Sequence, residues 1–205
     1  MDDTRKLVEK WEDLPPHFPY SPSFILIEDF KILRRELFLN VGMAIVAVAI
    51  LVLITVASLM TSFLITLVVF FCLVDILGLM YALNIAIDSV SVINIVLAIG
   101  LSVDYSAHVG HCFMTKGGND KNKRSTEALA DVGAAVRNGA ISTFLAVAVL
   151  LFSSSYVFRT LSQQLALTVV LGALHGLIFL PVLLSLFGPN PFESAQHKND
   201  YVKNR

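Results

Sequence analysis

Charged residues are scarce in this sequence of 205 residues, of which 15% are Asp, Glu, Lys or Arg and 56% are hydrophobic. A soluble globular domain carries about 25% charged residues, and the mean hydropathy here is +0.73. No charged residue occurs from Leu37 to Val74. That run is too long for one membrane span of ~20 residues and long enough for most of two. The composition therefore predicts an integral membrane protein.

Other common signals are also missing. The two cysteines, Cys72 and Cys112, fall in apolar segments, so no disulfide framework can be read. The basic residues are scattered and form no basic face with interleaved aromatic residues, which argues against a nucleic-acid partner. No P-loop, Gly-x-Ser-x-Gly, His-Glu-x-x-His or Cys-x-x-Cys motif occurs. We therefore expect neither an enzyme nor a cofactor.

The apolar segments predict an all-α polytopic membrane protein, with a transmembrane domain at residues 37–187 built from five helices. The expected spans are 37–59, 63–83, 89–113, 139–156 and 161–187. Merging the first two would need a helix of roughly 57 Å, nearly twice the ~30 Å hydrocarbon core. We expect the polar pair Thr61-Ser62 to form the turn between them.

The remaining segments are polar or amphipathic. We expect residues 1–22 to be a linker or the end of an extracytoplasmic domain, and residues 23–36 to form an amphipathic helix at the membrane surface. Residues 114–138 are expected to be a loop, within which Ser125 caps a short helix, and residues 188–205 a tail. Lys and Arg are more frequent beside this loop and tail than beside the N-terminal segment. The positive-inside rule therefore predicts a cytoplasmic loop and C-terminus, with the N-terminus outside or lumenal.

The third span carries a polar stripe. At ~100° per residue, Gly100, Asp104, His108 and His111 fall within an arc of about 80°. A carboxylate in hydrocarbon costs on the order of 3 kcal/mol, and such residues usually face a bundle interior, a partner charge or a water path. Asp104 is therefore a candidate proton-exchanging group, the alternative being a structural carboxylate that is hydrogen-bonded within the bundle.

The two histidines are weaker candidates. His108 is one turn from Asp104 and could share its proton, or it could be a packing or interfacial histidine. His111 lies near the cytoplasmic end of the span, where a solvated histidine is the expectation. All three titratable groups lie on one helix and no second helix offers obvious ligands, so we expect no metal site.

A few further polar or small residues lie inside the other spans. Asp75 could make a polar contact or line a cavity, or it could reflect local packing. Asn94 lies about 80° around its helix from the stripe acid, so we expect it to bond across a helix interface. Gly172 and Gly176 form a small-xxx-small motif that permits close helix approach. His175 beside them is expected to be a hydrogen-bond partner.

The block LMYALNIAIDSVSVINIVLAIGLSVDYSAHVGHCFM, residues 79–114, resembles the Patched family, which includes the Niemann-Pick type C sterol transporters, within the resistance-nodulation-division permease superfamily. Its most specific part is the Gly-x-x-x-Asp motif of Gly100 and Asp104, preceded by SVSVIN and followed by an aromatic residue and Ser-x-His. The flanks HFPYSPSFILIEDFKIL, EALADVGAAVRNGAISTF and LPVLLSLFGP agree. The resemblance extends from about Phe18 to Pro189.

This resemblance implies that the five helices are the last five of a twelve-span permease whose halves are parallel repeats. It also implies that Asp104, with His108 beside it, faces acidic residues of the first half and couples a proton or cation to movement of a sterol or another lipid. The implied partners are membrane lipids, including sterols, and the N-terminal half of the permease, which these 205 residues lack. The alternative is a non-transporting scaffold or lipid-responsive regulator, which needs only the packing surfaces.

Overall fold

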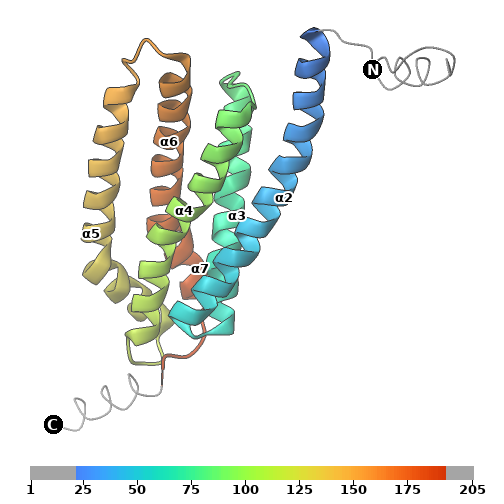
Figure 1. Cartoon of the computed structure of the whole chain (residues 1–205). Coiled ribbons are helices and arrows are strands. Elements are labelled where there is room, and N and C mark those ends of the chain that lie inside the picture. The colour runs from blue at the N-terminus through green and yellow to red at the C-terminus, as the bar shows by residue number, and fades with distance from the viewer. Residues whose placement is uncertain (1–21, 193–205) are drawn as a thin grey trace, which may run out of the picture. The chain divides into compact units, whose positions relative to one another are not determined.

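The computed structural model describes residues 22–192, with side chains from residue 32 onward. Residues 1–21 and 193–205, which hold most of the predicted linker and tail, lie outside the described residues. The described elements are α2 (Pro22–Val56), α3 (Leu59–Ala82), α4 (Ser89–Thr115), α5 (Lys121–Leu150), α6 (Tyr156–Leu174), the π-helix η1 (His175–Phe179) and α7 (Leu180–Phe187) (Figure 1). Among them are five helical segments long and apolar enough to cross a membrane, so the predicted all-α, five-span class is confirmed.

The first helix crosses the boundary between two parts of the chain, residues 1–39 and residues 40–205. The predicted surface helix 23–36 and the predicted first span are one continuous helix, α2. Most of its side chains after Asn40 are exposed or partly exposed, among them Met43 and Ile54, which are 62% and 73% exposed. A largely apolar helix with such exposure is suited to lipid or to the surface of another helix.

The predicted turn at Thr61-Ser62 is wrong. α2 ends at Val56, and the turn is made by Ala57, which adopts a left-handed backbone with φ 51°, and Ser58. Thr61 and Ser62 are buried inside α3, and the Thr61 hydroxyl donates to the sulfur of Met114 at 3.2 Å. A hydroxyl within a membrane helix can find a partner on a neighbouring helix, so its polarity did not mark a turn.

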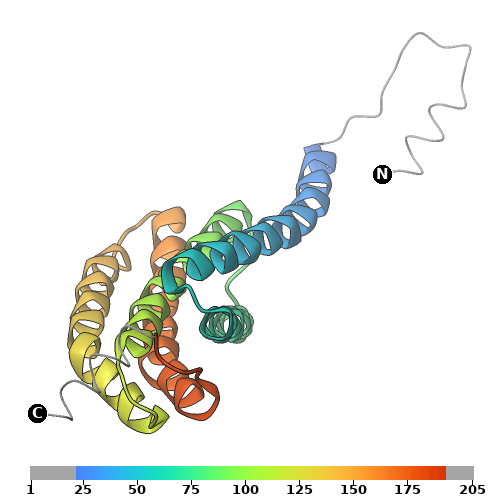
Figure 2. The same cartoon turned by 90° about the horizontal axis from the view of Figure 1, so that it is seen from below.

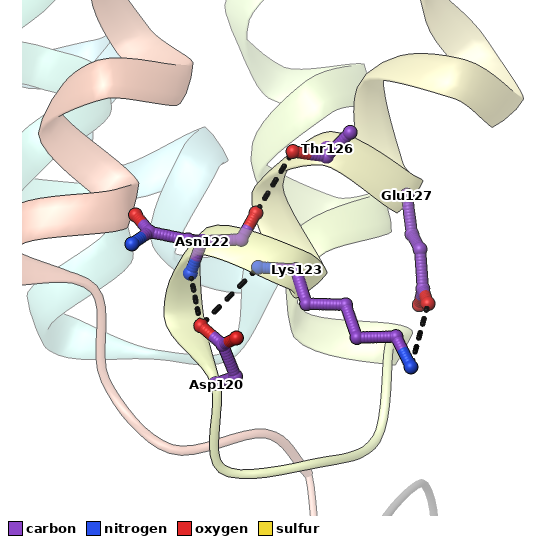
Figure 3. Close-up of polar contacts among 5 residues, drawn as sticks. All are labelled: Asp120, Asn122, Lys123, Thr126 and Glu127. Carbon is purple, nitrogen blue, oxygen red and sulfur yellow. Dashed lines mark hydrogen bonds and ion pairs between the residues drawn. The ribbon is translucent and has the colours of Figure 1, made fainter.

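The predicted loop 114–138 and the predicted span 139–156 are also corrected, because α5 is one helix that begins at Lys121. Figure 3 shows its first turn, where the Asp120 carboxylate accepts hydrogen bonds from the backbone N–H groups of Asn122 at 2.9 Å and Lys123 at 3.3 Å. Lys123 also pairs with Glu127 one turn later at 3.9 Å. An aspartate at the N-cap satisfies backbone donors that the helix leaves open.

The residue predicted as that cap, Ser125, is buried inside the helix and donates to the carbonyl of Pro181 at 2.8 Å. Its neighbour Arg124 is only 2% exposed. The Arg124 guanidinium donates to the carbonyls of Pro189 at 2.8 Å and Phe113 at 3.0 Å, and it lies 4.0 Å from the centre of the Phe113 ring. These contacts hold the start of α5 against the ends of α4 and α7, which explains why a charged segment belongs to the bundle.

The helix α4 is the centre of the bundle, because it packs against α3, α5, α6, η1 and α7 (Figure 1 and Figure 2). The last predicted span is a long helical segment from α6 to α7 that contains the π-turn η1. Pro181 follows that turn and has no N–H group to donate to the carbonyl four residues earlier. A π-turn is a common way to accommodate such a local break in the hydrogen-bond ladder.

Candidate functional site

The predicted polar stripe lies on one side of α4 and is exposed along the whole helix. The exposed face consists of Ile93, Leu97, Gly100, Asp104, His108 and His111. The structure thus places Gly100, Asp104, His108 and His111 on one face of α4. The stripe continues toward the start of the helix with aliphatic side chains, and toward the end of the helix it carries the titratable ones. The described helices do not cover this face.

The opposite face of α4 explains why the helix is held in this rotation. The Ser102 hydroxyl contacts the Cys72 thiol of α3 at 3.4 Å. Gly110 lies so close to α3 that a Cβ built on it would be 2.5 Å from a side-chain carbon of Ile65. Since this buried face is packed on α3 and α6, a rotation that turned Asp104 inward would break these contacts.

Both ends of α4 are capped by charged residues. Partial burial would raise the pKa of Asp88, but its hydrogen bonds with Ser91 and Tyr156 outweigh this effect and hold the pKa below the usual range of an aspartate. At the other end Lys116 forms an ion pair with Asp131 of α5, and this contact raises the pKa of the Lys116 ammonium. Asp88 and Lys116 are therefore charged at neutral pH and mark the polar boundaries of the span.

The titratable groups of the stripe are Asp104, His108 and His111. None of them makes a hydrogen bond or ion pair with another described side chain. A Cβ built on Gly100 would meet nothing within 4 Å. No helix that the structure describes packs closely on Gly100. The site consists of an open small residue beside an unpaired acid and histidine.

Asn94 lies on the buried side of α4 and is 1% exposed. Its amide donates to the side-chain carbonyl of Gln164 on α6 at 2.6 Å, and the Gln164 amide donates to the Ser91 hydroxyl at 2.6 Å. Gln164 is not among the residues that the sequence singles out, so this network was not predicted. A buried glutamine one residue from an exposed one, Gln163, leaves no signal in the local composition.

Gly172 and Gly176 face α4 at Tyr105. A Cβ at Gly172 would lie 3.1 Å from a ring carbon of Tyr105, and a Cβ at Gly176 would lie 3.0 Å from the Tyr105 carbonyl carbon. Because the two helices approach this closely, only glycine fits without a shift of α4 at Gly176. The small-xxx-small motif thus lies at the contact between α4 and the segment formed by α6 and η1.

Asp75 pairs with a residue outside the stripe. Its Oδ2 atom lies 3.3 Å from Nε2 of His175 in the π-turn. Asp75 is half-exposed and His175 is largely buried, at 55% and 13% of their side-chain surfaces. Sequence reasoning expected a hydrogen-bond role for His175 and did not identify the acid as its partner, because the two lie on different helices.

Apolar grooves accompany these polar groups. A groove of about 480 Å³ lies beside the aliphatic part of the stripe and includes Met43, Ile93 and Leu97. Another, of about 430 Å³, runs between α5 and α6 with Phe144 and Val170 in its walls. Among residues 32–192, no cluster of three or more His, Cys, Asp or Glu side chains could hold a metal ion. The described residues thus place titratable side chains and apolar grooves on the surface of the same bundle.

Comparison with known proteins matches this sequence to a family. The model of the MMPL family matches residues 24–202. The chain is 31% identical over 176 residues to the NPC intracellular cholesterol transporter 1 of Sus scrofa, and 33% identical over 175 residues to the NPC intracellular cholesterol transporter 1 homolog 1b of Drosophila melanogaster. It is 34% identical over 175 residues to protein patched homolog 2 of Mus musculus.

These matches cover most of this chain and a small part of each relative. They include 84%, 84% and 85% of the chain but only 14%, 14% and 15% of the respective relatives. The chain therefore spans about one seventh of the length of the curated relatives it matches.

Proposed function

This chain belongs to the MMPL family, alongside the NPC-type cholesterol transporters and the Patched proteins, and we propose that it is the helical part of a permease that moves a sterol or another lipid. In this proposal Asp104 takes up and releases the coupling proton or cation. Its partner groups come from helices outside these 205 residues. The substrate class is inferred from the relatives, whereas the role of Asp104 is argued from its position.

The observation that carries the proposal is an unpaired carboxylate on the open face of an apolar helix. An ionised carboxylate that meets only hydrocarbon costs on the order of 3 kcal/mol at the least. Asp104 can avoid that cost by binding a proton, or by facing a cation or a donor on another helix. A group that changes charge as its surroundings change is what coupling to an ion gradient requires.

Two neighbours make Asp104 suitable for this task. His108 lies one turn toward the end of α4 on the same face, where it can donate a hydrogen bond to the carboxylate or receive its proton. Gly100 lies one turn in the other direction and leaves open space, so a second helix can approach the carboxylate closely. The stripe is thus shaped for a protein partner as well as for proton exchange.

The grooves support the lipid part of the proposal. The groove between α5 and α6 is lined almost wholly by apolar side chains and contains one cation, Arg137. The volume of about 430 Å³ is within the usual range for small-molecule sites. A sterol or acyl chain would find almost exclusively apolar contacts there, which fits a protein whose cargo is lipid.

The test is Asp104→Asn, introduced into the native gene so that any longer product carries it. Asparagine keeps the size and polarity of the side chain but cannot bind or release a proton. We expect gradient-dependent movement of sterol or lipid to be abolished, while protein amount and membrane insertion stay unchanged. Asp104→Glu should retain part of the activity, and Asp131→Asn, which changes an exposed acid on α5, should retain all of it.

Unchanged transport in Asp104→Asn would refute the coupling role. A second outcome would favour the alternative, a scaffold or lipid-responsive regulator. In that outcome the native protein moves no lipid in response to a gradient, yet cells still need the gene. That interpretation needs only the packing surfaces around Tyr105 and makes no use of the exposed stripe.

A further inference from the structure

A second acid lies inside the membrane-spanning part of this chain, and its setting differs from that of Asp104. Asp75 belongs to α3 and contacts His175 at 3.3 Å between Oδ2 and Nε2. The other ring nitrogen of His175, Nδ1, lies 2.9 Å from the backbone carbonyl of Leu171. The histidine is therefore held between two acceptor groups, a carbonyl on one side and a carboxylate on the other.

This arrangement fixes where protons must be. A carbonyl oxygen only accepts hydrogen bonds, so Nδ1 of His175 carries a hydrogen and donates it to Leu171. A neutral imidazole has one N–H group, which leaves a lone pair on Nε2 facing Asp75. Two acceptors at 3.3 Å repel each other unless a proton lies between them. The contact is attractive only when the pair holds one additional proton.

The aromatic surroundings favour the form of the Asp75–His175 pair that holds a proton. The His175 ring is in edge contact with Phe179 at 5.6 Å between ring centres, and Phe179 is in edge contact with Phe71 of α3 at 6.1 Å. With its proton the pair has no net charge, whereas without it the pair leaves a negative charge beside these rings. An apolar setting thus stabilises the form that holds the proton.

The pair also opens onto a groove at the surface of the described helices. Asp75 is 55% exposed and lines a groove of about 470 Å³ together with Phe71, Ile178 and Phe179. His175 begins η1, and π-turns of this kind are frequently found at functional sites. The widened backbone lets the histidine side chain reach α3 while Gly176 still packs on α4.

We propose that Asp75 and His175 form a second proton-binding site, separate from the Asp104 stripe, which holds one proton between Asp75 Oδ2 and His175 Nε2 and exchanges it with water through the groove. The proton leaves to water, and the pair changes from neutral to singly negative. Loss of the proton turns the contact between α3 and η1 from attractive to repulsive. The site is a proton-dependent latch between these two elements.

Other titratable or charged groups lie on the elements that pack around η1. These are Cys72 and Tyr81 on α3, Asp104, Tyr105, His108, His111 and Cys112 on α4, Lys121, Lys123, Arg124, Glu127, Asp131 and Arg137 on α5, and Tyr156 and Arg159 on α6. Cys72 is engaged with Ser102 at 3.4 Å, and Tyr105 lies against the glycines of the last helical segment. Among the histidines that the structure describes, only His175 has both ring nitrogens engaged by fixed acceptors, so its pair with Asp75 is expected to require a bound proton.

The test compares thermal unfolding of the 205-residue chain in lipid nanodiscs across pH, for Asp104→Asn alone and for Asp104→Asn combined with Asp75→Asn. Above a pH of ~6.5 an unfolded histidine is neutral and an unfolded aspartate is ionised. The folded native pair then binds one proton more than the unfolded chain, so stability should fall as pH rises through the range where the pair releases its proton. This alkaline loss is the signature of the site.

Asp75→Asn should reverse the sign. The asparagine amide can donate to the Nε2 lone pair at every pH, so the folded histidine stays neutral and the hydrogen bond is kept. The unfolded histidine binds a proton below a pH of ~6.5, so this variant should lose stability as pH falls and show no alkaline loss. A merely structural hydrogen bond would leave the two pH profiles parallel, and that result would overturn the proposal.

A common background and one further variant keep the test decisive. Every chain in the unfolding test carries Asp104→Asn, because an unpaired Asp104 that binds a proton in the folded chain would add an alkaline loss of its own. His175→Asn should show neither the alkaline loss nor the acid loss, and it replaces Asp75→Asn if that variant does not fold. Nitrogen NMR of labelled histidine gives an independent check, because Nδ1 of His175 should be protonated at neutral pH in the native chain. A His175 with its only proton on Nε2 would also overturn the proposal.

Discussion

The contrast between the two faces of the bundle can be measured with one substitution made at three glycines. Replacing Gly100, Gly172 and Gly176 in turn by alanine adds one methyl group at each site, with very different surroundings. At Gly100 the new Cβ meets nothing within 4 Å, at Gly172 it lies 3.1 Å from the Tyr105 ring, and at Gly176 it lies 3.0 Å from Tyr105 backbone and Cβ atoms. We expect stability to fall in that order.

The magnitudes follow from two opposing effects. Alanine is favoured over glycine in a helix by about 1 kcal/mol, and this gain is shared by all three variants. Overpacking costs about 1–3 kcal/mol where neighbours cannot yield. At Gly176 the neighbours include the Tyr105 carbonyl, which moves only with α4, so the full cost applies. At Gly172 a ring edge can shift by a few tenths of an ångström, so the two effects should nearly cancel.

Thermal unfolding of the three variants in one lipid composition provides the assay. Since the propensity gain cancels between variants, the gap between Gly100→Ala and Gly176→Ala isolates the overpacking cost. A gap of about 1–3 kcal/mol corresponds to roughly 2–12 °C in Tm for a chain of this size. A Gly100→Ala variant as destabilised as Gly176→Ala would refute the open stripe, since it would mean that a helix of this chain packs on Gly100.

Two more predictions concern buried polar contacts. Gln164→Leu should cost about 1–3 kcal/mol, because it leaves the buried partners of that amide unsatisfied, whereas Gln163→Leu at an exposed site should change the free energy of unfolding by less than about 0.5 kcal/mol. Arg124→Met should cost about 2–4 kcal/mol, because two carbonyls lose a charged donor. The matched control for Arg124→Met is Arg137→Met at an exposed site. Chemical unfolding in bicelles measures the free energy of unfolding of all four variants. Equal losses for a buried residue and its exposed control would contradict the placement of these side chains.

Much of the fold follows from local composition. The charge-free run from Leu37 to Val74 and the later apolar runs predict five spans, because a membrane helix needs about 20 apolar residues. The turn before α3 could not be predicted in the same way. Ala57 adopts φ 51°, a left-handed conformation that alanine does not favour, so the residue type gives no sign of the turn. The nearby Thr61 hydroxyl is satisfied by Met114 across the bundle instead of in a turn.

The start of α5 was missed for a related reason. Arg124 and its charged neighbours lower the local hydropathy, and a membrane-span pattern does not tolerate them. The carbonyls that satisfy Arg124 belong to Phe113 and Pro189, which are 11 and 65 residues away in the sequence. Such a contact exists only after the helices have packed, so no window of neighbouring residues contains it.

The candidate site was predictable in part, again for physical reasons. Helical periodicity alone places Asp104 and His108 on one face, since both lie on one helix. Whether that face is inward or outward depends on the contacts of Gly110 and Ser102 with α3, which sequence periodicity does not specify. The pairing of Asp75 with a histidine of another helix depends on tertiary packing for the same reason.

The two intramembrane acids of this chain therefore pose different requirements. Asp75 has a partner within the chain, so its charge can be neutralised without any other protein segment. Asp104 has none among the described residues and lies beside open space at Gly100. An acid in hydrocarbon must be compensated by a proton, a cation or a hydrogen-bond donor, and packing on the other side of α4 prevents Asp104 from turning toward the helices described. Its compensation must then come from a proton, a cation or a group other than the described helices, which is the requirement that the coupling role proposed for Asp104 would meet.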